Sequence, residues 1–127
     1  MRLWIVAVVV LCSTLALAAE KPLSFAQAKK VWEQSKDRKE YQTYSSEFAQ
    51  FNNHFRLDEK DGCYALAKGT VELMLVITHP AGQKYAVIAE VLSDVDNPKA
   101  QCFKGSYRGV QTKIPPFFPF VLQMSMG

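Results

Sequence analysis

The chain has 127 residues, of which 49% are hydrophobic and 12% aromatic, so one domain has enough apolar surface to build a core. Its formal net charge is only +3, from 15 basic and 12 acidic residues. This balance argues against nucleic acid or an anionic membrane as a partner, because either would be expected to require a clustered basic face.

The amino-terminal residues have the layout of a secretory signal. Arg2 precedes an uncharged run over residues 3–17, and small alanines follow at a cleavage position. We therefore expect residues 1–19 to be a signal peptide, cleaved after Ala18 or Ala19. This predicts a periplasmic or secreted mature protein with no stable membrane insertion. An uncleaved anchor is the alternative, because the run is close to the shortest helix that spans a bilayer.

Residues 20–60 are expected to form a helical region. Ser24 is a residue type that favours helix N-caps. Small and apolar residues then recur on one side of a helical wheel, namely Phe25, Ala28, Val31, Trp32 and Ser35. The charged run over residues 36–40 predicts a solvated helix end or a break between two helices.

A second helix is indicated from about residue 40 to 55 by aromatic residues at steps of three and four. They are Tyr41, Tyr44, Phe48, Phe51 and Phe55. We interpret this aromatic face as core that packs against a sheet. A ligand or partner groove is the alternative, to which Asn52, Asn53 and His54 would contribute polar groups.

The strongest strand signals lie between residues 70 and 92. Two runs alternate with a period of two, and their apolar faces are Val71, Leu73, Leu75 and Ile77, then Tyr85, Val87, Ala89 and Val91. Residues 79–84 between them contain the Pro and Gly expected of a turn. The pattern predicts an antiparallel hairpin, covered by a helix on one side and partly wet on the other.

A helix is expected after the hairpin, with Asn97 as its cap, Pro98 as its first residue and an end near Tyr107. Asp94, Asp96 and Asn97 also suggest calcium ligands. The segment lacks the central Gly and the closing Glu of an EF-hand loop, so capping is the favoured interpretation.

A last strand is predicted at the carboxyl end, where Phe120, Leu122, Met124 and Met126 alternate with Val121, Gln123 and Ser125. The whole pattern predicts an α+β fold in one domain over residues 20–127. It would contain amino-terminal helices and a three-stranded antiparallel sheet in the order strand, strand, helix, strand, with that helix covering one face.

Removal of the signal peptide takes Cys12 with it and leaves Cys63 and Cys102. An even cysteine pair in an exported protein predicts a disulfide between them. A metal site formed by His54, Cys63, His79 and Cys102 is the alternative. Its spacings lack a C-x-x-C or H-x-x-x-H pair, so no metal or other cofactor is expected.

Residues 69–126 resemble the carboxy-terminal domain of TonB-type energy transducers. The resemblance rests on the hairpin over residues 71–77 and 87–93, a helix that contains a cysteine, and proline and phenylalanine before the last strand. It implies a periplasmic domain, residues 63–127, that binds peptides or receptor plugs by adding a strand, without catalysis. TonB-type transducers also have a retained anchor and a long Pro-rich spacer, which this chain lacks, so energy transduction is not expected.

These observations favour a non-enzymatic interaction module that binds an envelope protein or peptide by strand addition. The chain carries no charged residue from Ile114 onward, so the last strand lacks the lysines that usually protect an edge. The predicted contact residues lie on this strand: Phe120, Val121, Leu122, Gln123, Met124 and Ser125. An inhibitor of an envelope hydrolase is the alternative, with residues 79–84 as the presented loop.

A small periplasmic enzyme is the least favoured class. A triad would have to be assembled from His54 or His79 with Asp58, Asp94 or Ser106. The chain contains no nucleophile elbow, H-E-x-x-H motif or phosphate-binding Gly-rich loop.

Overall fold

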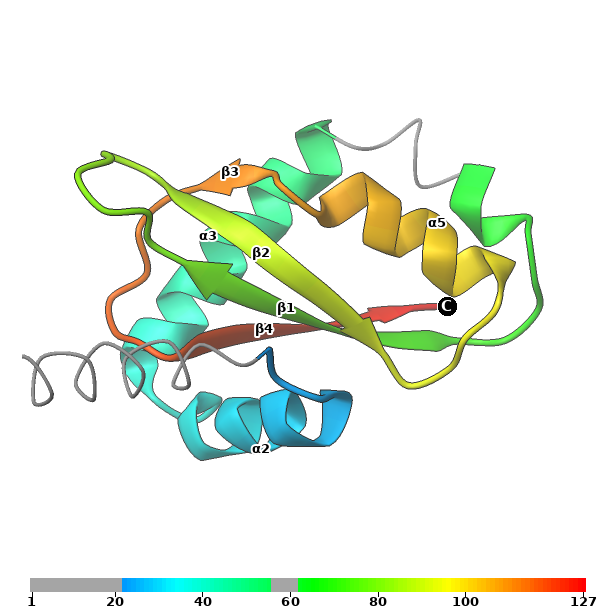
Figure 1. Ribbon diagram of the computed structural model, residues 1–127, viewed down its shortest axis with the longest axis horizontal. Helices are drawn as coiled ribbons and strands as arrows, with labels where there is room; N and C mark the ends of the chain where they lie inside the picture. The colour runs from blue at the N-terminus through cyan, green and yellow to red at the C-terminus, as the bar shows by residue number, and fades with distance from the viewer. Residues whose placement is uncertain (1–21, 56–61) are drawn as a thin grey trace, which may run out of the picture.

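The computed structural model describes residues 22–55 and 62–127, so the expected signal peptide over residues 1–19 lies outside it. The helices are α2 (Phe25–Ser35), α3 (Lys39–Phe55) and α5 (Pro98–Tyr107), and the strands are β1 (Val71–Thr78), β2 (Ala86–Ser93), β3 (Gln111–Thr112) and β4 (Phe120–Met126). Figure 1 shows the strands as one twisted sheet with helices packed around it. The α+β class is therefore confirmed.

The sheet is antiparallel, with the strand order β3-β2-β1-β4. The prediction of three strands was wrong, because the described residues form four. The extra strand, β3, has only two residues and pairs with the first two residues of β2. It forms because the chain returns along β2 after Gly109, whose φ of 82° favours glycine, and Val110 then accepts a hydrogen bond from the Ile88 N–H at 2.9 Å.

The main core lies between the sheet and the helices α3 and α5. The inward side chains of β1 are those that the sequence predicts, Val71, Leu73, Leu75 and Ile77, and none is more than 1% exposed. Three aromatic residues of α3 pack on this face: Tyr41, Tyr44 and Phe48. The core interpretation of the aromatic stripe is confirmed for these three. The side chains of residues 51–55 lie outside the described set.

The second face of β1 and β4 is covered by α2, which Figure 1 shows beside these strands. Ala28 of α2 packs there on Met74 and Val121, and all three are fully buried. Of the face that was expected to be partly wet, this part is therefore dry, whereas Ser125 on the same face of β4 is exposed. The cause of the dry part is the short amino-terminal helix, whose narrow stripe of small and apolar residues is sufficient to cover it.

The face that β2 presents to the core changes within the strand. Val76 is opposite Glu90 but Ile77 is opposite Ile88, so Ala89 is an extra residue that forms a β-bulge. Val91 faces the core as predicted. Beyond the bulge the buried residues are Ile88 and Ala86, in place of the predicted Ala89 and Val87. A single extra residue exchanges the side chains that face the core with those that face away from it. An analysis that assumes strict alternation along the strand cannot detect such a residue.

Both predicted helix N-caps, Ser24 and Asn97, are confirmed. The Ser24 side chain accepts a hydrogen bond from the Gln27 N–H in a capping box, and Asn97 caps α5 by accepting from the Ala100 N–H at 2.8 Å. The charged segment over residues 36–38 is the break between α2 and α3.

The predicted disulfide between Cys63 and Cys102 is present, with the two Cα atoms 5.4 Å apart. It joins the helical turn at residues 62–64 to α5. Because each sulfur is bonded to the other, these cysteines are not free to act as metal ligands. Lys99 makes a second connection nearby, since its Nζ donates to the Gly69 carbonyl at 2.6 Å.

None of the helices in the described ranges, residues 22–55 and 62–127, has the length and apolar character needed to cross a membrane.

Candidate functional site at the edge of strand β4

Strand β4 lies at one edge of the described sheet, with β1 as its only neighbouring strand there. Ser125 of β4 is paired with Glu72 of β1. The backbone groups of Glu72 face the other way: its N–H donates to the Asp94 carboxylate at 2.9 Å, and its carbonyl accepts from the Asp94 N–H at 3.1 Å. Residues opposite each other in an antiparallel pair exchange both hydrogen bonds or neither. The N–H and carbonyl of Ser125 therefore point away from β1.

Gln123 has the same orientation, since it lies two residues before Ser125. Its N–H donates to the Tyr41 hydroxyl at 3.4 Å, from α3. Tyr41 is only 5% exposed and stacks on Phe120 with the ring centroids 5.3 Å apart. Burial raises the pKa of Tyr41, although the hydrogen bond from the Gln123 backbone acts in the opposite direction.

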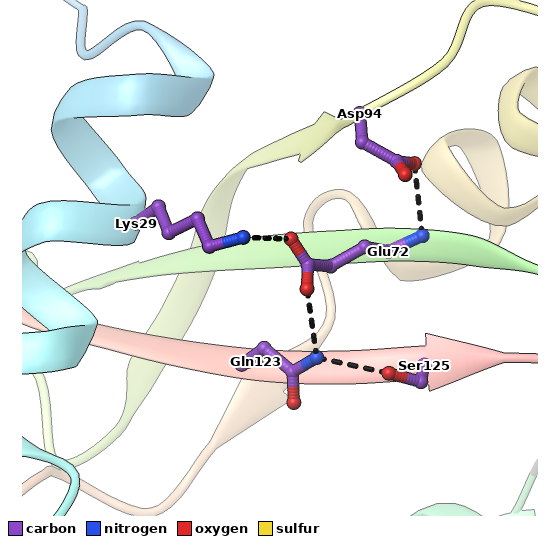
Figure 2. Close-up of polar contacts among 5 residues, drawn as sticks. All are labelled: Lys29, Glu72, Asp94, Gln123 and Ser125. Carbon is purple, nitrogen blue, oxygen red and sulfur yellow. Dashed lines mark hydrogen bonds and ion pairs between the residues drawn. The ribbon is translucent and has the colours of Figure 1, made fainter.

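Figure 2 shows a polar cluster on the α2 face of the same edge. Lys29 Nζ is 3.0 Å from Glu72 Oε1, and Gln123 Nε2 donates to Glu72 Oε2 at 3.4 Å and to Ser125 Oγ at 2.9 Å. The hydrogen bond and the charge of Glu72 raise the pKa of Lys29. Lys29 is thus protonated and forms an ion pair with the Glu72 carboxylate. The amide oxygen of Gln123 points away from Glu72 and Ser125 (Figure 2).

The six predicted contact residues divide into two groups. The side chains of Phe120, Val121 and Leu122 are buried and belong to the core. Gln123 and Met124 are partly exposed, and Ser125 is exposed. A partner at this edge would therefore meet the backbone of β4 together with the last three of these side chains.

The hairpin loop proposed for an inhibitor is internally bonded. The His79 Nε2–H donates to the Gln83 carbonyl at 2.7 Å, and the Gln83 N–H donates to the Pro80 carbonyl at 3.2 Å. The His79 ring is also nearly parallel to that of Phe118, at a centroid distance of 6.4 Å. This loop lies at the end of the sheet farthest from the turn at residues 62–64 (Figure 1).

The described members of the predicted triad are not brought together. His79 lies in the hairpin loop, Asp94 accepts from Glu72, and Ser106 Oγ lies 3.9 Å from Cys63 Sγ. His54 and Asp58 lie outside the described side chains. No group of three or more His, Cys, Asp or Glu that could hold a metal occurs in the part of the chain that the structure describes. Asp96 accepts from the Gln101 side chain, as expected of a capping loop.

A pocket of about 340 Å³ lies beside β3, and two of its lining residues, Tyr44 and Phe48, belong to the aromatic face for which a groove was the alternative interpretation. It is lined by Tyr44, Glu47, Phe48, Tyr85, Gln111, Thr112 and Lys113. The Tyr44 hydroxyl donates to the Lys113 carbonyl at 2.6 Å, and the Lys113 ammonium pairs with Glu47 at 2.9 Å. The two residues of β3, Gln111 and Thr112, form part of this lining. A strand of two residues is too short to be recognised from an alternating sequence pattern.

The chain matches no protein-family model, no curated protein and no solved structure. The resemblance to TonB-type domains stays a prediction from the sequence.

Proposed function

We propose that the protein is a non-enzymatic, exported interaction module that binds an extended segment of an envelope protein by adding it to β4. The observation that carries the proposal is the outward orientation of the backbone at Ser125, inferred from the two hydrogen bonds between Glu72 and Asp94. An incoming strand would use these backbone groups for its own ladder of hydrogen bonds.

The composition of the edge supports the proposal. Proteins commonly protect an exposed edge strand with lysine, proline or a bulge. The chain has no charged residue from Ile114 to Gly127, and β4 contains neither proline nor a register shift in its pairing with β1. Such an edge is suited to pairing with another backbone.

A second candidate function is inhibition of an envelope hydrolase through residues 79–84. The observation that favours it is the hydrogen bonding within this loop, from His79 to Gln83, together with the parallel rings of His79 and Phe118. A preorganised loop binds with a smaller loss of conformational entropy.

Capture from envelope extract with the mature protein, residues 20–127, tests both candidates. Ser125→Pro removes one outward N–H, whereas Ser125→Ala removes the hydroxyl but keeps the N–H. Strand addition predicts that the protein captured by the wild type and by Ser125→Ala is lost with Ser125→Pro, provided that the melting temperature shows the last variant to be folded. Capture that is unchanged by Ser125→Pro but lost with His79→Ala, together with inhibition of the captured hydrolase, would instead support the inhibitor.

A further inference from the structure

The outer edge of β4 is contacted from within the molecule at Gln123. The Gln123 N–H donates to the Tyr41 hydroxyl at 3.4 Å. In a sheet, this N–H would donate to a carbonyl of the next strand. The hydroxyl oxygen of Tyr41 therefore takes the place of a carbonyl oxygen from an added strand.

The position of this hydroxyl follows from the packing of its ring. Tyr41 lies in the first turn of α3, and its ring stacks on Phe120 with an angle of 28° between the ring planes. Phe120 is fully buried and also contacts the Tyr44 ring at 4.7 Å. The packing of the ring therefore places the hydroxyl at the edge of the sheet in the free protein. Burial also raises the pKa of Tyr41, so the hydroxyl stays neutral at ordinary pH.

The two faces of β4 beside this contact differ in chemistry. On the α2 face, the amide oxygen of Gln123 points away from its neighbours (Figure 2), and the exposed Ser125 hydroxyl accepts from Gln123 Nε2, which leaves its O–H free to donate. On the opposite face, Met124 is only partly buried against the core. Side chains of an added strand would alternate between these two environments.

From these observations we propose that Tyr41 closes the β4 edge in the free protein and that the partner is an extended segment which displaces its hydroxyl. A backbone carbonyl of the partner takes the Gln123 N–H. The side chains of the segment alternate between apolar residues, toward Met124, and polar residues that both donate and accept hydrogen bonds, toward Gln123 and Ser125. This inference rests on the proposed strand addition and adds its register and the pattern of its ligand.

The variant Tyr41→Phe removes only the hydroxyl, and Tyr44→Phe is its matched control. Tyr44 also lies on α3, contacts Phe120 and has a hydrogen-bonded hydroxyl, but its partner is the Lys113 carbonyl and not β4. We would titrate each protein by NMR with the peptide Lys-Val-Asn-Leu-Ser-Val-Asn-Lys. The same residues in the order Lys-Asn-Ser-Asn-Val-Leu-Val-Lys keep the composition and remove the alternation.

We expect Tyr41→Phe to bind the alternating peptide about two- to tenfold more tightly than the wild type, which corresponds to the loss of one competing hydrogen bond. Tyr44→Phe should bind like the wild type, and the peptide without alternation should bind more weakly to all three. Without peptide, the Gln123 amide should exchange faster in Tyr41→Phe alone. This measurement shows whether Tyr41 protects the edge even if the peptide binds weakly.

Three results would overturn the inference. If the alternating peptide binds Tyr41→Phe and the wild type equally, Tyr41 does not compete for the edge, although strand addition itself stands. Equal binding of the two peptides would refute the required pattern. Binding of neither peptide to any variant, with unchanged exchange at Gln123, would refute the inference as a whole, while the Ser125→Pro capture experiment decides the proposed function separately.

Discussion

Removal of the disulfide gives the largest stability change that we expect from a small perturbation. Cys63 and Cys102 are 39 residues apart, and the loop enclosed between them contains β1 and β2. The chain-entropy model gives about 4 kcal/mol for closing a loop of this length in the unfolded chain. In the double variant Cys63→Ala/Cys102→Ala, loss of the nearly fully buried Cys63 sulfur adds about 1 kcal/mol.

Urea unfolding followed by circular dichroism measures this loss. We expect the free energy of unfolding to fall by about 4 to 5 kcal/mol and the m-value to rise, because the unfolded chain without the bridge exposes more surface. Wild-type protein in excess reductant is the control and should fall by a similar amount. A loss below about 1 kcal/mol in both samples would refute the argument that the bridge acts mainly by restricting the unfolded chain.

Two further predictions concern buried polar groups. Burial raises the pKa of both Tyr41 and Tyr44 above the ordinary value of about 10. The stability that these neutral side chains contribute is therefore fully present below about pH 10 and is lost as the pH rises through the raised pKa values. The melting temperature should fall over that range, and a flat profile from about pH 9 to 11.5 would contradict this. Lys99 is 2% exposed, and Lys99→Ala should cost about 2 kcal/mol in urea unfolding because both its aliphatic stem and its hydrogen bond to Gly69 are lost. Lys99→Met, which keeps most of the stem, should cost less, and an equal loss would show that the stem contributes little.

The features that could be predicted from the sequence are those with local signals. Ser24 and Asn97 are caps whose side chains bond to N–H groups three residues away. The inward face of β1 follows from simple alternation, and the disulfide was predicted because Cys63 and Cys102 are the two cysteines outside the expected signal peptide.

The features that could not be predicted depend on tertiary context. The bulge at Ala89 reverses the inward face of β2, although every residue involved is compatible with either face. β3 consists of two residues that become a strand only because Gly109 directs the chain back along β2. The contact between Tyr41 and Gln123 joins residues 82 positions apart. The periodicity that placed Tyr41 in the core therefore gave no indication that its hydroxyl reaches the sheet edge.

Residue-resolved amide exchange of β4, with and without the captured partner at saturation, tests the central claim most directly. The N–H groups of Gln123 and Ser125 point away from β1, whereas those of Leu122 and Met124 point toward it. Strand addition predicts that binding slows exchange at Gln123 and Ser125 and leaves Leu122 and Met124 nearly unchanged. Binding of the partner without this alternate-residue protection would contradict the account.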